Sequence, residues 1–151
     1  MLAIALAPMH AQSPGTVKEL AGYRLTTAVF QRFVPASRGI AAAVTADPRL
    51  AADPPFTREV AVSGDAAEVA PALEARLTRE PPLAAALSAA KISPHDYATF
   101  AIVLIGARLA HGFVKSGAMR FVPPGVASDN VAFIEAHERD IAEVLQILGV
   151  E

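Results

Sequence analysis

Residues 93–116 read S-P-H-D-Y-A-T-F-A-I-V-L-I-G-A-R-L-A-H-G-F-V-K-S, and this stretch has the strongest helical pattern in the chain. Ser93 stands where a helix needs a side-chain cap, and Pro94 suits the first helical position. Asp96 places a negative charge at the positive end of the helix dipole. Apolar residues then occupy nearly every position around the helix. A helix of this kind is buried on all sides, so we expect it to be the central element of an all-helical domain.

A membrane-spanning helix is the alternative interpretation of the same stretch. A span needs about 20 predominantly apolar residues with few charges. Arg108 and His111 interrupt this stretch before that length is reached. We therefore favour a buried core helix and expect that the chain is not an integral membrane protein.

The composition of the chain also favours helices. Its 151 residues include 33 alanines and only nine aromatic residues, so strand-forming side chains are sparse. The 13 basic and 15 acidic residues are spread along the chain, which argues against nucleic-acid binding. Cysteine is absent, which excludes thiolate nucleophiles, disulfides and zinc sites built on cysteine.

The N-terminal residues 1–11 read M-L-A-I-A-L-A-P-M-H-A, a short apolar run that ends in small residues. We interpret this run as a truncated secretory signal peptide that lacks its basic N-terminal part. The alternative is the apolar tail of a cytosolic protein. The first interpretation makes residues 12–151 a single domain that resides in the periplasm or outside the cell.

Apolar residues at helical spacing predict the remaining helices. The predicted helices cover residues 16–46, 65–78, 81–90, 93–116 and 128–148. Pro35 predicts a kink or a new helix start within the first of them. The proline-rich residues 47–64 predict an extended loop or a single helical turn. The predicted architecture is an up-and-down bundle of four main helices with one or two short extra helices.

Three segments carry a resemblance to a known group of proteins. They read Y-R-L-T at residues 23–26, I-S-P-H-D-Y at residues 92–97 and N-V-A-F-I-E-A-H-E at residues 130–138. In this order they resemble small secreted helical proteins of Gram-negative bacteria that have no known activity. The resemblance implies a helical fold and a location in the envelope or outside the cell, and it implies no reaction.

His137 is the most informative candidate binding residue. On a continuous helix it would lie within an apolar stripe, with Asn130 on the same line two turns earlier. A buried imidazole and a buried amide each need a hydrogen-bond partner. A structural network with Tyr23, Tyr97, Thr27 or backbone carbonyls is the first interpretation. The alternatives are a ligand for haem or a metal ion, with His111 and the two tyrosines as further ligands, and a cleft for a small apolar ligand.

Three basic residues, Arg108, His111 and Lys115, share one face at the C-terminal end of the central helix. The helix dipole favours cations at this end, so a solvated helix end is the first interpretation. An anion or carboxylate site is the alternative. Glu135 and Glu138 are the carboxylates expected to pair with this basic patch.

Known catalytic patterns are absent from the chain. It has no Glu-x-x-His pair of the kind found in di-iron bundles, no G-x-S-x-G elbow and no P-loop. The run from His137 departs from H-E-x-x-H at Ile141. His95, in the first turn of the central helix, is expected to be exposed. We therefore expect a protein that is not an enzyme.

The loop over residues 117–127 is unusually apolar, because it carries Met119, Phe121, Val122 and Val126. Such a loop covers the helices or contacts a partner. The leading hypothesis is a non-enzymatic periplasmic or secreted protein that acts through association with another protein or through self-assembly. The alternative is a helical bundle that binds haem, a metal ion or a small apolar ligand through His137.

Overall fold

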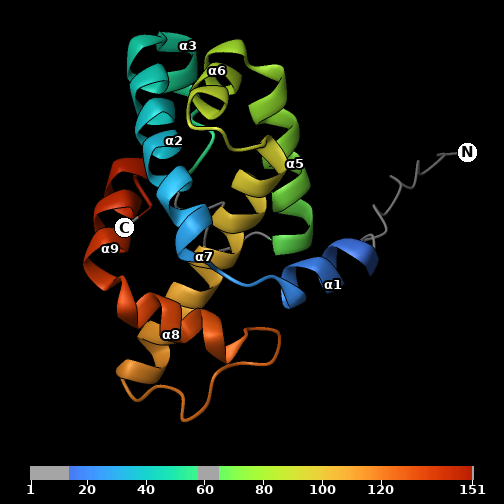
Figure 1. Ribbon diagram of the computed structural model, residues 1–151, viewed down its shortest axis with the longest axis vertical. Coiled ribbons are helices and arrows are strands. Elements are labelled where there is room, and N and C mark those ends of the chain that lie inside the picture. The colour runs from blue at the N-terminus through green and yellow to red at the C-terminus, as the bar shows by residue number, and fades with distance from the viewer. Residues whose placement is uncertain (1–13, 58–64, 151) are drawn as a thin grey trace, which may run out of the picture.

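The computed structural model describes residues 14–57 and 65–150, and these residues form eight helices and no strand (Figure 1). The helices are α1 (Pro14–Gly22), α2 (Thr27–Ala46), α3 (Pro48–Ala52), α5 (Ala66–Arg79), α6 (Pro81–Ala89), α7 (Pro94–Lys115), α8 (Ser128–Ala136) and α9 (Glu138–Leu148). The all-α prediction is confirmed, while the simpler description as four main helices running up and down stays a prediction. The predicted signal peptide, residues 1–11, lies outside the described residues.

Helix α7 lies at the centre of the molecule, as its sequence predicts. The side chain of Ser93 accepts a hydrogen bond from the Asp96 amide at 3.0 Å, and Pro94 stands at the first position. By length and composition α7 is apolar enough to cross a membrane, yet 56% of its most apolar window is buried by the rest of the protein. Helices α2, α5, α6 and α8 all pack against it.

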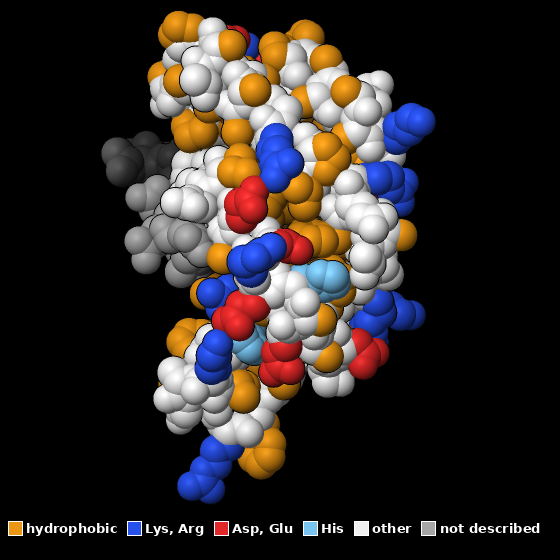
Figure 2. Space-filling model, turned by 60° about the vertical axis from the view of Figure 1, so that its left-hand side comes forward, with side chains coloured by type: hydrophobic (Ala, Val, Ile, Leu, Met, Phe, Trp, Pro, Cys, Tyr) orange, Lys and Arg blue, Asp and Glu red, His pale blue; other side chains and the backbone are white. Residues whose placement is uncertain are grey.

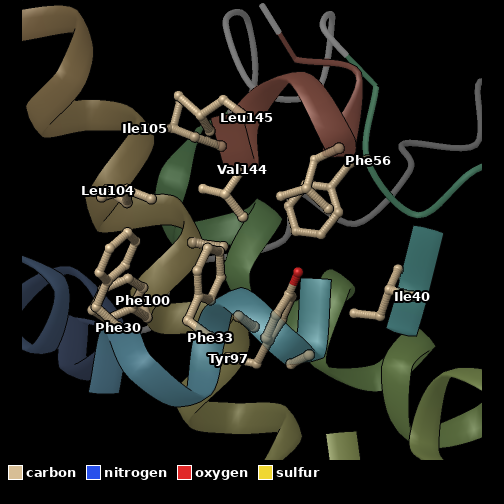
Figure 3. Close-up of a cluster of buried hydrophobic side chains, with 14 of the residues drawn as sticks. Phe30, Phe33, Ile40, Phe56, Tyr97, Phe100, Leu104, Ile105, Val144 and Leu145 are labelled. Atoms are coloured by element: carbon tan, nitrogen blue, oxygen red, sulfur yellow. The ribbon is translucent and has the colours of Figure 1, made fainter. Parts of the chain in front are cut away.

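An aromatic cluster joins α2 to α7 (Figure 3). The ring of Phe33 stacks on Tyr97, with 4.7 Å between the ring centroids, and lies 4.9 Å from the ring of Phe100. The Tyr97 hydroxyl lies 2.9 Å from the Ser37 hydroxyl, so the one polar atom of this ring has a partner. Burial raises the pKa of Tyr97, and its hydroxyl therefore stays protonated.

The predicted helix over residues 16–46 is two helices, and the break lies at residues 23–26 instead of Pro35. Thr26 starts α2, because its hydroxyl accepts a hydrogen bond from the Val29 amide. Helix α2 then continues through Pro35, which leaves the Gln31 carbonyl without its usual helical donor. Pro35 therefore lies inside α2 and does not end it.

The predicted helix over residues 128–148 is also two helices, with His137 between α8 and α9. His137 has φ −123° and ψ 20°, which takes the chain out of the helical path. Helix α8 packs on α7, whereas α9 packs on α2, so the chain must turn between them. The turn removes the continuous stripe on which the prediction for His137 rested.

The segment before α5 is partly helical. Asp47 ends α2 and also caps α3, because its carboxylate accepts a hydrogen bond from the Arg49 amide at 2.9 Å. Of the predicted loop 47–64, the last seven residues lie outside the described residues. Gly149, with φ 71°, ends α9 in the left-handed conformation that glycine favours.

Candidate functional site

A cavity of about 240 Å³ lies between α1, α5, α7 and the loop that precedes α8. We call it the α1 cavity. It is partly open to solvent, and its wall is mainly apolar. The wall includes Val17 and Leu20 of α1, Ala67 of α5, Ile102, Val103 and Gly106 of α7, and Val126 of the loop. Asp65 and Asn130 are the polar residues that line it.

Small residues in the wall leave this space open. Gly106 faces the cavity, and a Cβ atom added there would meet nothing within 4 Å. Gly125 has φ 89°, a backbone conformation that side chains disfavour, and it turns the loop so that Val126 joins the wall. The cavity therefore exists because glycine, which has no side chain, stands at positions 106 and 125.

Asn130 fixes the chain that leads from α1 into α2. Its side chain is buried, its Oδ1 accepts a hydrogen bond from the Leu25 amide and its Nδ2 donates one to the Tyr23 carbonyl, both at 2.9 Å. These two bonds satisfy backbone groups that lie outside any helix. The sequence predicted a buried amide with a backbone partner, but it placed His137 beside it.

His95 joins α1 and α5 to the first turn of α7. Its Nε2 lies 2.8 Å from Oε1 of Glu19, and its Nδ1 lies 2.9 Å from Oε2 of Glu74. The hydrogen bonds to Glu74 and then to Glu19 raise the pKa of His95. Only the imidazolium form donates from both ring nitrogens at once, so this arrangement requires a protonated ring.

The sequence predicted only that His95 is exposed, and its side chain is 49% exposed. Its two partners were missed because they lie 76 and 21 residues away in the chain. No local pattern marks such a pair. The sequence does show a histidine in the first turn of a helix and glutamates in other helices. That combination is too common to predict that these side chains meet.

His137 lies in a different place from the one predicted. It is half-buried at the turn between α8 and α9, and its ring packs 4.4 Å from Phe133 and 5.4 Å from Phe30. Its Nε2 lies 3.5 Å from the Thr27 hydroxyl. It lines a groove of about 390 Å³ between α2 and α9, which is also partly open to solvent, together with Asp140. His137 therefore does not lie within the continuous apolar stripe of one helix that the sequence had predicted.

The basic patch is also different from the prediction of a solvated helix end. His111 is only 5% exposed, and its Nδ1 is buried without a hydrogen-bond partner. Its Nε2 lies 3.8 Å from Oε1 of Glu135, and Lys115 pairs with Glu138 at 2.8 Å. This pair lowers the pKa of Glu138. Carboxylates thus already neutralise part of the patch, which leaves less charge for a bound anion.

The side of the molecule that carries α2 and α9 also presents charged residues. Figure 2 shows acidic and basic side chains alternating there, with two histidine side chains among them. Arg38 and Glu143 pair at 2.7 Å across the groove between α2 and α9. Charges of both signs lie close together, so this side presents no large field of one sign.

The two tyrosines do not meet the histidines. Tyr97 lies in the aromatic cluster with Ser37 as its hydrogen-bond partner. Tyr23 is half-buried and packs edge-on against Phe100, and burial raises its pKa. No hydrogen bond or ring contact joins either tyrosine to His137 or His111 within the part of the chain that the structure describes. The four residues named as candidate haem or metal ligands are therefore not brought together.

The apolar loop residues are divided between two environments. Phe121 is 81% exposed and Met119 is 41% exposed. The ring of Phe113 in α7 is also exposed, and it lies near Met119, whose amide donates a hydrogen bond to the Phe113 carbonyl. Val122 and Val126 are half-buried, and Val126 lines the α1 cavity. The loop both covers the helices and presents apolar side chains to solvent.

Among residues 14–57 and 65–150, no three histidine or carboxylate side chains are arranged to hold one metal ion. Glu19 and Glu74 do not converge either, because they bind opposite nitrogens of His95. The α1 cavity, with its apolar wall and one buried amide, is the arrangement best suited to hold a molecule. No protein-family model, curated protein or solved structure matches this chain.

Proposed function

We propose that the protein binds a small apolar molecule in the α1 cavity. The observation that carries this proposal is the mainly apolar wall of a preformed hollow that four segments of the chain build together. Binding of an apolar ligand in such a hollow is favourable, because it removes apolar surface of both the protein and the ligand from water. This function is the small-ligand alternative of the sequence hypothesis, moved from His137 to the α1 cavity.

The size of the cavity restricts the ligand class. About 240 Å³ is below the usual range of roughly 300–1,000 Å³ for drug-sized ligands. An aromatic molecule of two or three rings or a short acyl chain has the matching volume and the matching polarity. A polar end group on such a ligand finds Asn130 and Asp65 at the wall, beside an otherwise apolar surface.

Gly106 offers a direct test, because a larger side chain there would occupy the cavity itself. The probe is N-phenyl-1-naphthylamine, a neutral apolar dye whose fluorescence rises on burial. We expect Gly106→Leu to weaken its binding about tenfold or more, which corresponds to about 1.4 kcal/mol of lost burial. Gly112→Leu is the matched control, since Gly112 is on the same helix, has equal room for a Cβ and does not line the cavity. Equal affinity of the two variants would refute the proposal.

Association through the exposed loop is the second candidate, and it was the leading hypothesis from sequence. Phe121, at 81% exposed, together with Met119 and Phe113, supports it, because apolar side chains in this number favour burial against a partner. The partner is another protein or a second copy of this chain. We expect Phe121→Asp to reduce the sedimentation coefficient or abolish co-purification, while Ala118→Asp in the same loop changes neither. Unchanged assembly in Phe121→Asp would argue against this candidate.

We further propose a periplasmic or secreted location and an up-and-down arrangement of four main helices. Support for the location comes from the apolar run at residues 1–11 and from the resemblance stated above. Support for the arrangement comes from the pairing of α5 with α7 and of α2 with α9. N-terminal sequencing of the protein from a fractionated cell tests the location, and a first residue near Gln12 is expected.

A further inference from the structure

We propose that His95, Glu19 and Glu74 form a latch that holds α1 over the α1 cavity when His95 is protonated and releases it when His95 is neutral. This inference concerns the regulation of the cavity and rests on the proposed function. We call the three residues the His95 latch. Its consequence is that an apolar ligand enters and leaves faster at high pH than at low pH.

Helix α1 is placed to act as a cover. Val17, Leu20 and Ala21, spaced as one helical face, line the cavity, while Glu19 of the same helix reaches His95. Helix α1 packs mainly against α5, and Figure 1 shows it at the edge of the molecule, joined to α2 by an extended connection. Few apolar contacts therefore hold α1, so its polar contacts carry more weight.

The two ends of α1 are held differently. At its C-terminal end, Asn130 binds the backbone of Tyr23 and Leu25 through an amide that does not titrate. Gly22, where α1 ends, has no atom within 4 Å of an added Cβ, so the chain there is not enclosed. Among the described residues, the hydrogen bond from His95 to Glu19 is the polar link from α1 to α7. The geometry is that of a hinge near residue 22 and a latch at Glu19.

Protonation decides whether the latch is complete. The imidazolium donates to Glu19 and to Glu74, whereas neutral imidazole has one N–H and presents a lone pair to the other carboxylate. Glu19 of α1 and Glu74 of α5 are the charged groups within ion-pair distance of His95 among the described residues, and α2 and α6 supply none. Asp96, the next residue in α7, is engaged by the Ser93 hydroxyl. Both partners therefore favour the protonated ring.

The first experiment follows the position of α1 without any ligand. The chain has no cysteine, so spin labels placed at Lys18→Cys on α1 and Ala72→Cys on α5 report one distance. We expect a narrow distance distribution at pH 5.5 and a broader, longer one at pH 8.5. His95→Gln, which donates but does not titrate, should remove the pH dependence, and His137→Gln, a matched control remote from the α1 cavity, should preserve it. A distribution that is the same at both pH values overturns the latch.

The second experiment measures ligand exchange with N-phenyl-1-naphthylamine. We expect its dissociation rate to rise about threefold between pH 5.5 and pH 8.5, because two partly exposed pairs are each weak. Glu74→Gln should reduce this ratio towards one. Binding with a rate that ignores pH overturns the latch and leaves the proposed function intact. Absence of dye binding at both pH values refutes the proposed function, while the spin-label distances still decide the latch.

Discussion

Helices α7 and α1 both line the cavity, but different interactions hold them in place. The first half of α7 is enclosed by the aromatic rings of α2, and Tyr97, Phe100 and Leu104 have no exposed surface. Helix α1 has no fully buried large side chain, and polar bonds from Asn130 and His95 fix it. The cavity therefore has one rigid wall and one wall whose position depends on a few hydrogen bonds.

This difference predicts two kinds of response to a change in the protein. Burial of apolar surface does not depend on pH, and it couples α7 to global unfolding. Hydrogen bonds to ionisable groups depend on pH, and those at the edge of a molecule affect local opening first. Variants in α7 should therefore change the free energy of global unfolding, whereas variants at the bonds that hold α1 should change its local opening.

The largest effect is expected from Phe100→Ala, which removes a fully buried ring from the centre of the aromatic cluster. Such a change costs about 3–5 kcal/mol, because it loses burial and leaves a cavity. Urea unfolding measures this loss, and Phe121→Ala, at an exposed ring, should change stability by less than about 0.5 kcal/mol. Equal losses in the two variants would break the assignment of α7 as the rigid region.

A smaller effect is expected from Asn130→Ala, which leaves the Leu25 amide and the Tyr23 carbonyl without their partner. We expect a loss of about 2 kcal/mol, the usual cost of unsatisfied buried polar groups. Hydrogen exchange should show α1 opening faster while α7 keeps its protection. Asp129→Ala is the neighbouring control, because its carboxylate is 81% exposed and makes only a 3.6 Å pair with Arg24.

Ser37→Ala tests the polar contact inside the rigid region. It leaves the buried Tyr97 hydroxyl without a partner, at a cost of about 1 kcal/mol or more. The double variant with Tyr97→Phe removes both hydroxyls and should recover most of this loss in urea unfolding. A double variant as unstable as the sum of the two single variants would show that the hydroxyls do not interact.

The smallest effect concerns pH. Hydrogen bonds to Glu74 and Glu19 raise the pKa of His95 in the folded protein above its unfolded value of about 6.5. The stabilisation is therefore complete below pH about 6.5 and is lost as the pH rises through the folded pKa. Because the ring is 49% exposed, the expected loss is only about 0.5 kcal/mol. NMR titration of the His95 ring measures the pKa, and Glu74→Gln should lower it.

The sequence predicted α7 well, because its determinants are local. The cap at Ser93 and the proline at the first position lie within one stretch and act as expected. The apolar circumference is buried in the first half of α7, whereas Leu109 and Phe113 in the second half are exposed. The break at residues 23–26 was missed although Thr26 gives a local capping signal, and the Asn130 side chain that holds this segment lies more than 100 residues away. No new helix starts at Pro35, since an exposed helix face tolerates proline at the cost of one hydrogen bond.

The candidate site was harder to predict than the fold. The prediction for His137 assumed one helix over residues 128–148, and the turn at His137 removed that assumption. His111 was assigned to solvent from its charged neighbours, but α8 packs over it. A cavity is formed by side chains from several elements, and periodicity within each element cannot show which of them meet.

The hydrogen bond from the Leu25 amide to Asn130 joins residues that are 105 positions apart. A ribosome that adds about 5–20 residues per second needs roughly 5–20 s to make the chain between them. The α2 and α7 rings lie much closer in sequence and can meet earlier. During synthesis, the connection from α1 to α2 therefore lacks its bonds to Asn130 until residue 130 has been made, and the α1 cavity, whose wall includes Asn130, is completed only after that point.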